Sequence, residues 1–531
     1  MLIQCKFKME PVIQPLQYFK KLDQDPSLFQ QQSELVQKSL SEFKIIIQDF
    51  LCGNESADLT EIREILRIIR KLLSVHQKPA QDLVREADIY PSLFKLVQQE
   101  HSLITAFLGF MVNFITANPE NQSLTLPDLL SNEFLLSQAL LQNESTFYLL
   151  LYFHNSIVNN STHRDHFFFH SPAFTLITHS ILKDYPHFDT DSAFFSQVHE
   201  WYTRILMIAL TTQTVSGDKV ESLYRAVFVK CGGQLVGGEF SLAEIQVSEG
   251  VVMKGVTTVQ AKLLKYTAEL VEELSEDNVA NAVTLDKLSR GKDLMLLLAQ
   301  DIFPALIRAY RENFTLEEFL RKLHNQDSDS SVLLQTHEDT LDALDALLCI
   351  FGDLTALTAD EQYLAQSPHQ NQTDANELTT YLNSLSLLET VLILFHTLKT
   401  SVDTMREVKS YHSQESAAKV RKEEDTKLFA GFFSKITKLL ANLTYLQKQA
   451  VEDAFLHRNK AYMGLVLGHA RMDENNPTMR EWCLMVIRNM CQVSSGVREM
   501  LQGLKKVDVG EGVLEEMGIK EQYEQQMKKY V

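Results

Sequence analysis

Residues 61–73 read EIREILRIIRKLL, and their apolar side chains recur every three or four positions. On a helix these apolar side chains form one stripe, while the basic side chains lie mostly away from it. The stripe consists of Ile62, Ile65, Leu66, Ile69, Leu72 and Leu73. The segment therefore predicts an amphipathic helix with one buried face.

Two further segments can be laid on this helix by a constant shift. Residues 103–113 read LITAFLGFMVN, and residues 147–155 read FYLLLYFHN. In this alignment Lys71, Asn113 and Asn155 coincide, at spacings of 113 − 71 = 42 and 155 − 113 = 42. A recurring period of this size is typical of helical repeat proteins. The spacing predicts repeats of three helices each.

The same pattern returns later in the chain. Residues 347–358 repeat the apolar run with Asp353 in the Asn position, and Asn442 and Asn489 follow at equivalent places. One repeat cannot bury its own apolar face, so neighbouring repeats must stack to form a continuous core. We therefore expect an all-α fold, an armadillo/HEAT-like α-solenoid with a right-handed superhelix.

The composition agrees with this fold class. The 531 residues include 19 Gly and 12 Pro, together 31 or about 6% of the chain. Average usage is about 12%, and β-rich folds and dinucleotide-binding folds need many such turn residues. A single core stops growing at about 250–300 residues, whereas a stack of repeats has no such limit. The composition thus excludes most β-rich folds and favours stacked helices.

Charge and apolar patterning limit the partners. With 50 Lys and Arg against 69 Asp and Glu, the net charge is −19, which opposes binding to phosphate backbones. Residues 387–398 form the longest apolar stretch, which polar residues interrupt, so no membrane span is expected. No secretory signal is recognised at the amino terminus, and the six cysteines are scattered without CxxC pairs. We expect a cytoplasmic protein that binds neither nucleic acid nor membrane.

The sequence offers only weak candidates for a metal site or a catalytic site. His163, His166 and His170 would share one helical face and could hold zinc, but no HExxH motif accompanies them. Motifs for phosphate binding or an activated nucleophile are absent from the sequence. We therefore expect no catalytic residue, no metal and no cofactor. Ser171 and Ser367 precede prolines and are open to proline-directed phosphorylation.

Three segments depart from the repeat pattern. We interpret residues 211–259 as a loop-rich insertion with β-favouring stretches at 226–229 and 251–252. Residues 361–379 lack apolar periodicity and predict a polar loop, and residues 405–427 predict either a solvated helix or a linker. The last segment gives a domain boundary near residue 425.

The recurring asparagines have two alternative roles. An Asn on the third helix of a repeat can bond to the backbone of the adjacent repeat or to an extended peptide bound in the groove. Buried polar side chains are usually satisfied within the fold, which favours the first role. The residues concerned are Asn113, Asn155, Asn442 and Asn489.

The carboxy-terminal segment resembles a known family. FFSKITKLLANLTY at 432–445 is followed by GLVL at 464–467, DENNPTMREW at 473–482 and IRN at 487–489. This ordered string is similar to the ataxin-10 domain, the carboxy-terminal signature of the armadillo-like ataxin-10 family. The matching residues are Gly464, Asp473, Asn476, Pro477, Glu481, Trp482, Ile487, Arg488 and Asn489. The resemblance divides the chain into an armadillo-like repeat region at 1–425 and an ataxin-10 domain at 426–531.

The motif has a physical interpretation of its own. Pro477 would open the last long helix, where its missing N–H costs little, and Glu481 would lie in the first turn. Trp482 and Asn489 lie about two turns apart, and a buried Trp482 would anchor the last two repeats. Import receptors place a Trp four residues before the Asn in successive repeats, but Met485 holds that position here.

The resemblance implies a non-enzymatic protein-binding scaffold that acts in cell division, particularly cytokinesis. In animal members it implies a role in neurite growth and cell survival. Its partners would be other proteins bound along the superhelical surface, and self-association stays open. The alternative function is an import-receptor-like cargo adaptor that binds basic peptides in its groove.

Overall fold

The chain is described by a computed structural model. The structure describes residues 13–25, 29, 33–53, 58–183, 193–210, 217–230, 234–236, 239–248, 251–275, 292–313, 330–356, 372–412, 431–470 and 478–503. Contacts within the chain divide it into two compact units, Met1–Leu357 and Thr358–Val531. The boundary predicted near residue 425 lies outside the described residues and stays a prediction.

The first unit is almost entirely helical in its described part. Short π-helical (η2, η3, η4) and 3₁₀ (η1) segments extend or precede several α-helices. The helices are α1 (Ile13–Gln24), α3 (Ser33–Leu51), α4 (Leu59–Glu86), α5 (Tyr90–Gln99), η1 (His101–Leu103), α6 (Ile104–Ile115), α7 (Pro119–Ser131), α8 (Glu133–Ala139), α9 (Asn143–Ile157), α10 (Ser161–Asp165), η2 (His166–His170), α11 (Ala173–Lys183), α12 (Ala193–Leu210), α13 (Gly217–Tyr224), η3 (Arg225–Lys230), α14 (Thr258–Ser275), α16 (Lys292–Leu296), η4 (Leu297–Ile302), α17 (Phe303–Asn313) and α19 (Ser330–Ala356).

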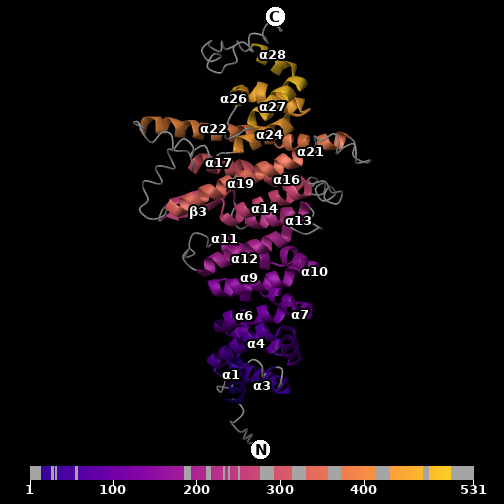
Figure 1. The fold of residues 1–531 in the computed structure, drawn as a ribbon, viewed down its shortest axis with the longest axis vertical. Coiled ribbons are helices and arrows are strands. Elements are labelled where there is room, and N and C mark those ends of the chain that lie inside the picture. The colour runs from indigo at the N-terminus through magenta and orange to yellow at the C-terminus, as the bar shows by residue number, and fades with distance from the viewer. Residues whose placement is uncertain are drawn as a thin grey trace, which may run out of the picture. The chain divides into compact units, whose positions relative to one another are not determined.

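The third helices of successive repeats pack against one another. Helix α4 contacts α6, α6 contacts α9, α9 contacts α12, α12 contacts α14, and α14 contacts α19. Figure 1 shows α4, α6, α9 and α12 following one another in chain order along the first unit. This succession confirms the predicted α-solenoid of three-helix repeats, because each unit of the stack touches mainly its neighbours.

Helix α4 shows why the sequence folds in this way. The Asp58 side chain caps its amino terminus and accepts a hydrogen bond from the Thr60 N–H at 2.9 Å. All six side chains of the predicted stripe are buried, and each such Ile or Leu contributes about 1.5–3 kcal/mol when buried. The helix bends at Gln77, which has a φ of 39°, two residues before Pro79. The bend turns the third helix of one repeat into the first helix of the next.

The insertion predicted at 211–259 contains two antiparallel hairpins. Strand β1 (Gln234–Val236) pairs with β2 (Glu239–Ser241), and β3 (Ala243–Ser248) pairs with β4 (Val251–Gly255). The β prediction for residues 251–252 is confirmed. The β prediction for residues 226–229 was wrong, because these residues lie in the π-helix η3. Ala226, Val227 and Phe228 are all buried there, so packing overrides their β propensity.

The second unit contains its own stack of helices. Helix α22 contacts α24, and α24 contacts α27. Its elements are α21 (Gln372–Ser384), α22 (Leu387–His412), α24 (Phe432–Thr444), α25 (Lys448–Glu452), the π-helix η5 (Asp453–Arg458), α26 (Ala461–His469), α27 (Met479–Val493) and α28 (Ser495–Gly503).

Two segments predicted as a loop or a linker are partly helical in this unit. The polar loop at 361–379 was wrong for its last part, because α21 begins at Gln372. Thr379 and Leu382, which are buried among the described side chains of this helix, lie at or beyond the end of the predicted loop. The first part of 405–427 belongs to α22, which ends at His412, and the remainder lies outside the described residues.

Among the described residues, no single helix is long and apolar enough to cross a membrane. The two helical segments Glu377–Ser384 and Leu387–Asp403 reach the required length and apolar composition only when they are taken together. The chain bends by 65° between them.

A buried carboxyl joins α14 to α19. Thr258 Oγ1 donates to Asp339 Oδ2 at 2.7 Å, and Gln335 Nε2 donates to Asp339 Oδ1 at 3.1 Å. Burial raises the pKa of Asp339 to about 6, although these two hydrogen bonds act to lower it. The folded chain therefore holds this proton more tightly than the unfolded chain, whose carboxyl has the ordinary pKa of 3.8.

We predict that Asp339 makes the first unit less stable as the pH rises. Its contribution is fully present below pH 3.8 and is lost as the pH rises through about 6. Asp339→Asn should flatten this part of the stability profile, by up to about 3 kcal/mol for a two-unit shift. Urea unfolding midpoints across this pH window measure the slope. Glu338→Gln, an exposed change on the same helix, should leave the slope unchanged, and equal slopes for Asp339→Asn and the parent chain would contradict the prediction.

Candidate protein-binding surface

The recurring asparagines Asn113, Asn155 and Asn489 connect neighbouring repeats. Asn113 Nδ2 donates to the Arg70 carbonyl at 3.0 Å, and Asn489 Nδ2 donates to the Ala441 carbonyl at 2.9 Å. Asn155 Nδ2 donates to Thr116 Oγ1 at 3.0 Å. Asn113 and Asn489 thus bond to the backbone of the preceding repeat, which is the role favoured from the sequence, whereas Asn155 bonds to a side chain there.

Buried glutamines that were not predicted from the sequence complete these junctions. Gln81 Nε2 donates to the carbonyls of Asn113 at 2.8 Å and Thr116 at 2.9 Å, while its Oε1 accepts from Asn118 Nδ2 at 3.1 Å. Gln122 Nε2 donates to the Asn155 carbonyl at 2.9 Å in the next repeat. Their spacing of 122 − 81 = 41 follows the repeat period, and this recurrence is the signal that could have revealed them.

We predict that Asn489→Ala destabilises the second unit. Asn489 is only 4% exposed, and its loss removes one buried donor from the Ala441 carbonyl, which keeps a bond from Thr444 Oγ1 at 3.1 Å. The expected loss is about 1–2 kcal/mol in the free energy of unfolding, measured by urea titration. Gln492→Ala, an exposed change on the same helix, is the control and should have little effect. Identical midpoints for the parent and Asn489→Ala would contradict the prediction.

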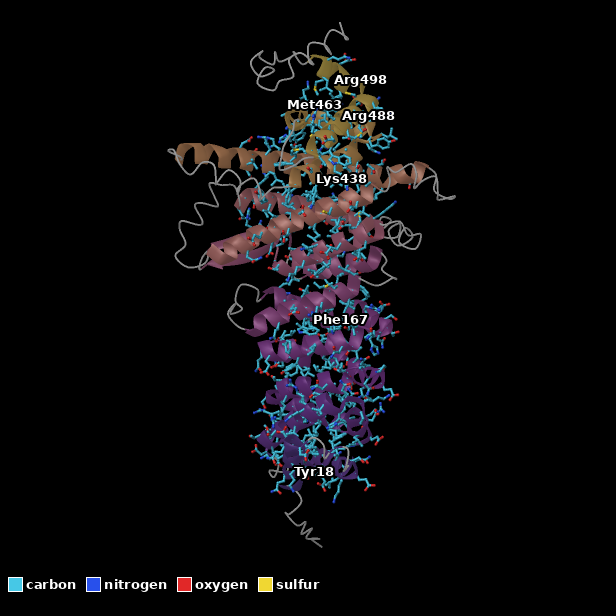
Figure 2. The ribbon with its side chains drawn as sticks, viewed as in Figure 1. Tyr18, Phe167, Lys438, Met463, Arg488 and Arg498 are labelled. Carbon is cyan, nitrogen blue, oxygen red and sulfur yellow. The ribbon has the colours of Figure 1, made fainter. Side chains whose placement is uncertain are left out.

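The remaining family residues lie on the surface or outside the described part. Glu481 is exposed in the first turn of α27, as predicted, and Arg488 is exposed on the same helix (Figure 2). Gly464 is exposed on α26, and a Cβ at this position would meet no atom within 4 Å. Asn442 is partly buried on α24. Three predicted residues lie outside the described residues: Asp473, Asn476 and Pro477.

Trp482 is not the buried anchor that the sequence suggested. Its side chain is partly exposed, and the next turn of α27 leaves Leu484 48% and Met485 39% exposed. The buried line of α27 consists of Met479, Cys483, Val486, Asn489 and Met490. This line recurs every three or four residues, and Trp482 sits beside it rather than on it.

The three histidines considered as zinc ligands, His163, His166 and His170, lie near one another, and His163 contacts neighbouring polar groups. His163 Nδ1 lies 3.2 Å from the Ser156 carbonyl, and its Nε2 lies 3.4 Å from Ser123 Oγ. Burial lowers the pKa of His163, so its ring is neutral at neutral pH. The ring centroids of His166 and His170 lie 6.2 Å apart. In the described part of the chain, no group of three or more His, Cys, Asp or Glu is placed to hold a metal.

The third helices carry aromatic and cationic side chains that the stacking leaves partly exposed. The Arg70 guanidinium lies over the Tyr148 ring, with its Cζ 4.6 Å from the ring centroid. The Arg204 guanidinium lies over the Trp201 ring at the same distance. The His154 ring meets Trp201 edge-on with centroids 4.8 Å apart. We call these five residues the third-helix surface.

Charges on α4 differ in how they are paired. Lys71 Nζ lies 2.6 Å from Asp23 Oδ1, and Arg67 Nη2 lies 3.0 Å from Asp23 Oδ2. The Lys71 ammonium and then the Arg67 guanidinium hold the pKa of the Asp23 carboxyl below its usual range. Arg67 also bonds to Glu64 at 3.0 Å. These charges are satisfied within the first unit and leave little capacity for a partner.

Burial and aromatic contacts suit the third-helix surface to protein recognition. Tyr, Trp and Arg are enriched where partner proteins bind, because they combine large contact areas with hydrogen-bond donors. Burial lowers the pKa of His154, so this ring is neutral beside Trp201 at neutral pH. The arrangement offers flat aromatic faces and guanidinium donors, and it brings together no nucleophile and base.

Comparison with known proteins locates the family relationship in the second unit. The profile described as "Spinocerebellar ataxia type 10 protein domain" matches residues 432–530. The chain is also similar to the Ataxin-10 homolog of Dictyostelium discoideum, with 29% identity over 75 residues. That match covers 14% of this chain and 12% of the relative.

Two solved structures are similar over longer stretches. The first comes from a study of the phosphorylation-controlled interaction between cadherin and beta-catenin, with a TM-score of 0.34, 10% identity and coverage of 92% of this chain and 78% of that chain. The second is the SYS-1/POP-1 complex, with a TM-score of 0.27, 13% identity and coverage of 86% and 63%. The family profile and the Dictyostelium relative both support a resemblance to the ataxin-10 family, and the profile locates it at residues 432–530.

Proposed function

We propose that this chain is a non-enzymatic cytoplasmic scaffold that binds other proteins through its third-helix surface and acts in cell division, particularly cytokinesis. The observation that carries the binding role is the set of partly exposed Arg, Tyr, Trp and His side chains on successive third helices. The asparagines and glutamines are used in bonds between repeats, whereas these side chains stay at least partly exposed. Of the two guanidinium groups, Arg204 is paired with Glu200 on its own helix.

The role in cytokinesis rests on the ataxin-10 domain at residues 432–530. For animal members, the same resemblance supports a role in neurite growth and cell survival. The net charge of −19 supports a protein partner over nucleic acid, because binding to phosphate backbones depends on basic surfaces.

Affinity purification from dividing cells tests the scaffold. The full chain should capture a reproducible set of proteins, and a Tyr148→Ala/Trp201→Ala variant should lose most of that set. Phe134→Ala is the control, because Phe134 is 56% exposed on α8 and lies outside the third-helix surface. Failure to capture any partner, together with normal cytokinesis after depletion of the protein, would contradict the proposal.

Self-association and the binding of basic peptides can both be tested with the purified chain. A second copy of the chain is a candidate partner, and light scattering of the purified chain measures this self-association. The import-receptor alternative predicts saturable binding of basic localisation peptides. We expect no such binding, because the Arg70 guanidinium on the third-helix surface meets a basic peptide with like charge.

A further inference from the structure

Three consecutive third helices cooperate to hold one guanidinium. Arg70 extends from α4 across α6 and lies over the Tyr148 ring of α9. It crosses α6 at Gly109, where an added Cβ would lie only 2.8 Å from Arg70 Nη1. A glycine at this position makes room for the crossing, and the aromatic face fixes the guanidinium by a cation–π interaction.

This guanidinium has no acidic partner in the described part of the chain. No ion pair and no hydrogen bond of its side chain occurs there, whereas Arg67 and Lys71 on the same helix are both paired with Asp23. Arg70 is partly exposed. A guanidinium carries five N–H donors in its plane, and stacking on a ring uses its face rather than these donors. The Arg70 donors therefore remain available to an oxyanion from outside the chain.

The surroundings of Arg70 favour a carboxylate. Helix α6, which Arg70 crosses, has the sequence ITAFLGFMVNFI and carries no charged residue. At physiological salt, charges more than about 8 Å away are largely screened, so the net charge of the chain matters less than this local environment. An arriving acidic side chain meets one fixed cation above a neutral helix.

We propose that Arg70, held on Tyr148 across Gly109, anchors an Asp or Glu side chain from an extended acidic segment of a partner protein. This inference rests on the proposed scaffold function and assigns one contact within it. The planar guanidinium binds a carboxylate through two parallel N–H···O bonds. Because Arg70 is already immobilised on the ring, less side-chain entropy is lost on binding.

The test begins with a displayed library of short random-sequence peptides selected on the full chain. The expected result is enrichment of Asp or Glu at one fixed position of the selected peptides. Arg70→Gln should weaken binding of such a peptide about tenfold, the value of one charge-assisted contact. Replacing the selected acid by its amide should cost the same factor, and the two changes together should cost no more than one alone.

Two variants control for charge and for folding. Arg63→Gln removes a charge from the same helix, where Arg63 donates to the Ser102 carbonyl at 3.2 Å, and it should leave the affinity unchanged. Gly109→Ala keeps every charge but displaces the Arg70 guanidinium from its place over Tyr148, and it should weaken binding as Arg70→Gln does. Equal circular dichroism and unfolding midpoints for all variants establish that the fold is intact.

The outcomes separate this inference from the scaffold function. Selected peptides without an acidic preference, or an equal loss for Arg63→Gln, would overturn the assignment of Arg70. A partner that is captured from cells equally by the parent chain and Arg70→Gln would also overturn it, while the scaffold function would stand. Absence of both selected peptides and captured partners would overturn both. A requirement for phosphoserine in place of the acid would contradict a carboxylate ligand.

Discussion

Replacing Phe167 with alanine should lower the free energy of unfolding by about 3–5 kcal/mol, the usual cost of emptying a buried aromatic site. Phe167 is fully buried in the π-helix η2, within the first unit (Figure 2). Its ring centroid lies 4.6 Å from that of Phe153 on α9, 5.0 Å from that of Phe168 and 5.8 Å from that of Phe174 on α11. One side chain therefore joins three helical elements of two repeats.

Urea unfolding followed by circular dichroism measures this loss. The matched control is Phe134→Ala, which removes an aromatic ring that is 56% exposed and should change the midpoint little. If Phe167→Ala unfolds at the same urea concentration as the control, the packing between these repeats is not as described. Phe167→Leu should recover part of the loss, because it refills much of the cavity.

Gln81→Ala is the second change with a large expected effect. Gln81 is 1% exposed and satisfies the carbonyls of Asn113 and Thr116 and the amide of Asn118. Removal leaves the part-buried carbonyls of Asn113 and Thr116 and the buried amide of Asn118 without this partner, at about 1–2 kcal/mol each. We expect a total loss of about 3–6 kcal/mol in the free energy of unfolding.

Hydrogen exchange localises this effect. Amide protection should fall at the junction of α6 and α7, where the freed carbonyls lie, before it falls elsewhere in the first unit. Gln98→Ala is the control, because Gln98 is exposed on α5 and its removal leaves no buried group without a hydrogen-bond partner. Unchanged protection at the junction in Gln81→Ala would show that water or another side chain satisfies these groups.

Much of the fold could be predicted because its cause is local. The stripe on residues 61–73 and the 42-residue spacing of Lys71, Asn113 and Asn155 are visible in the sequence and are reproduced by α4, α6 and α9. The inter-repeat bonds of Asn113 and Asn489 follow from the same regularity. Residues that lie one period apart in the sequence lie on neighbouring repeats of the stack.

The features that escaped prediction depend on contacts between distant residues or on helix phase. Arg70 and Tyr148 are 148 − 70 = 78 residues apart, and no periodicity marks them as a pair. The depth of Trp482 depends on the phase of α27 within the second unit, where the buried line passes through Cys483 and Val486. Propensity favoured strands at 226–229, but burial on η3 decided their conformation.

We propose above that successive third helices of the first unit form a protein-binding surface. Hydrogen exchange of the full chain, free and bound to a partner captured from dividing cells, tests it most directly. We expect increased protection in α4, α6, α9 and α12, with the largest change around Arg70, Tyr148 and Trp201. Protection confined to other helices, with these segments unchanged, would contradict it.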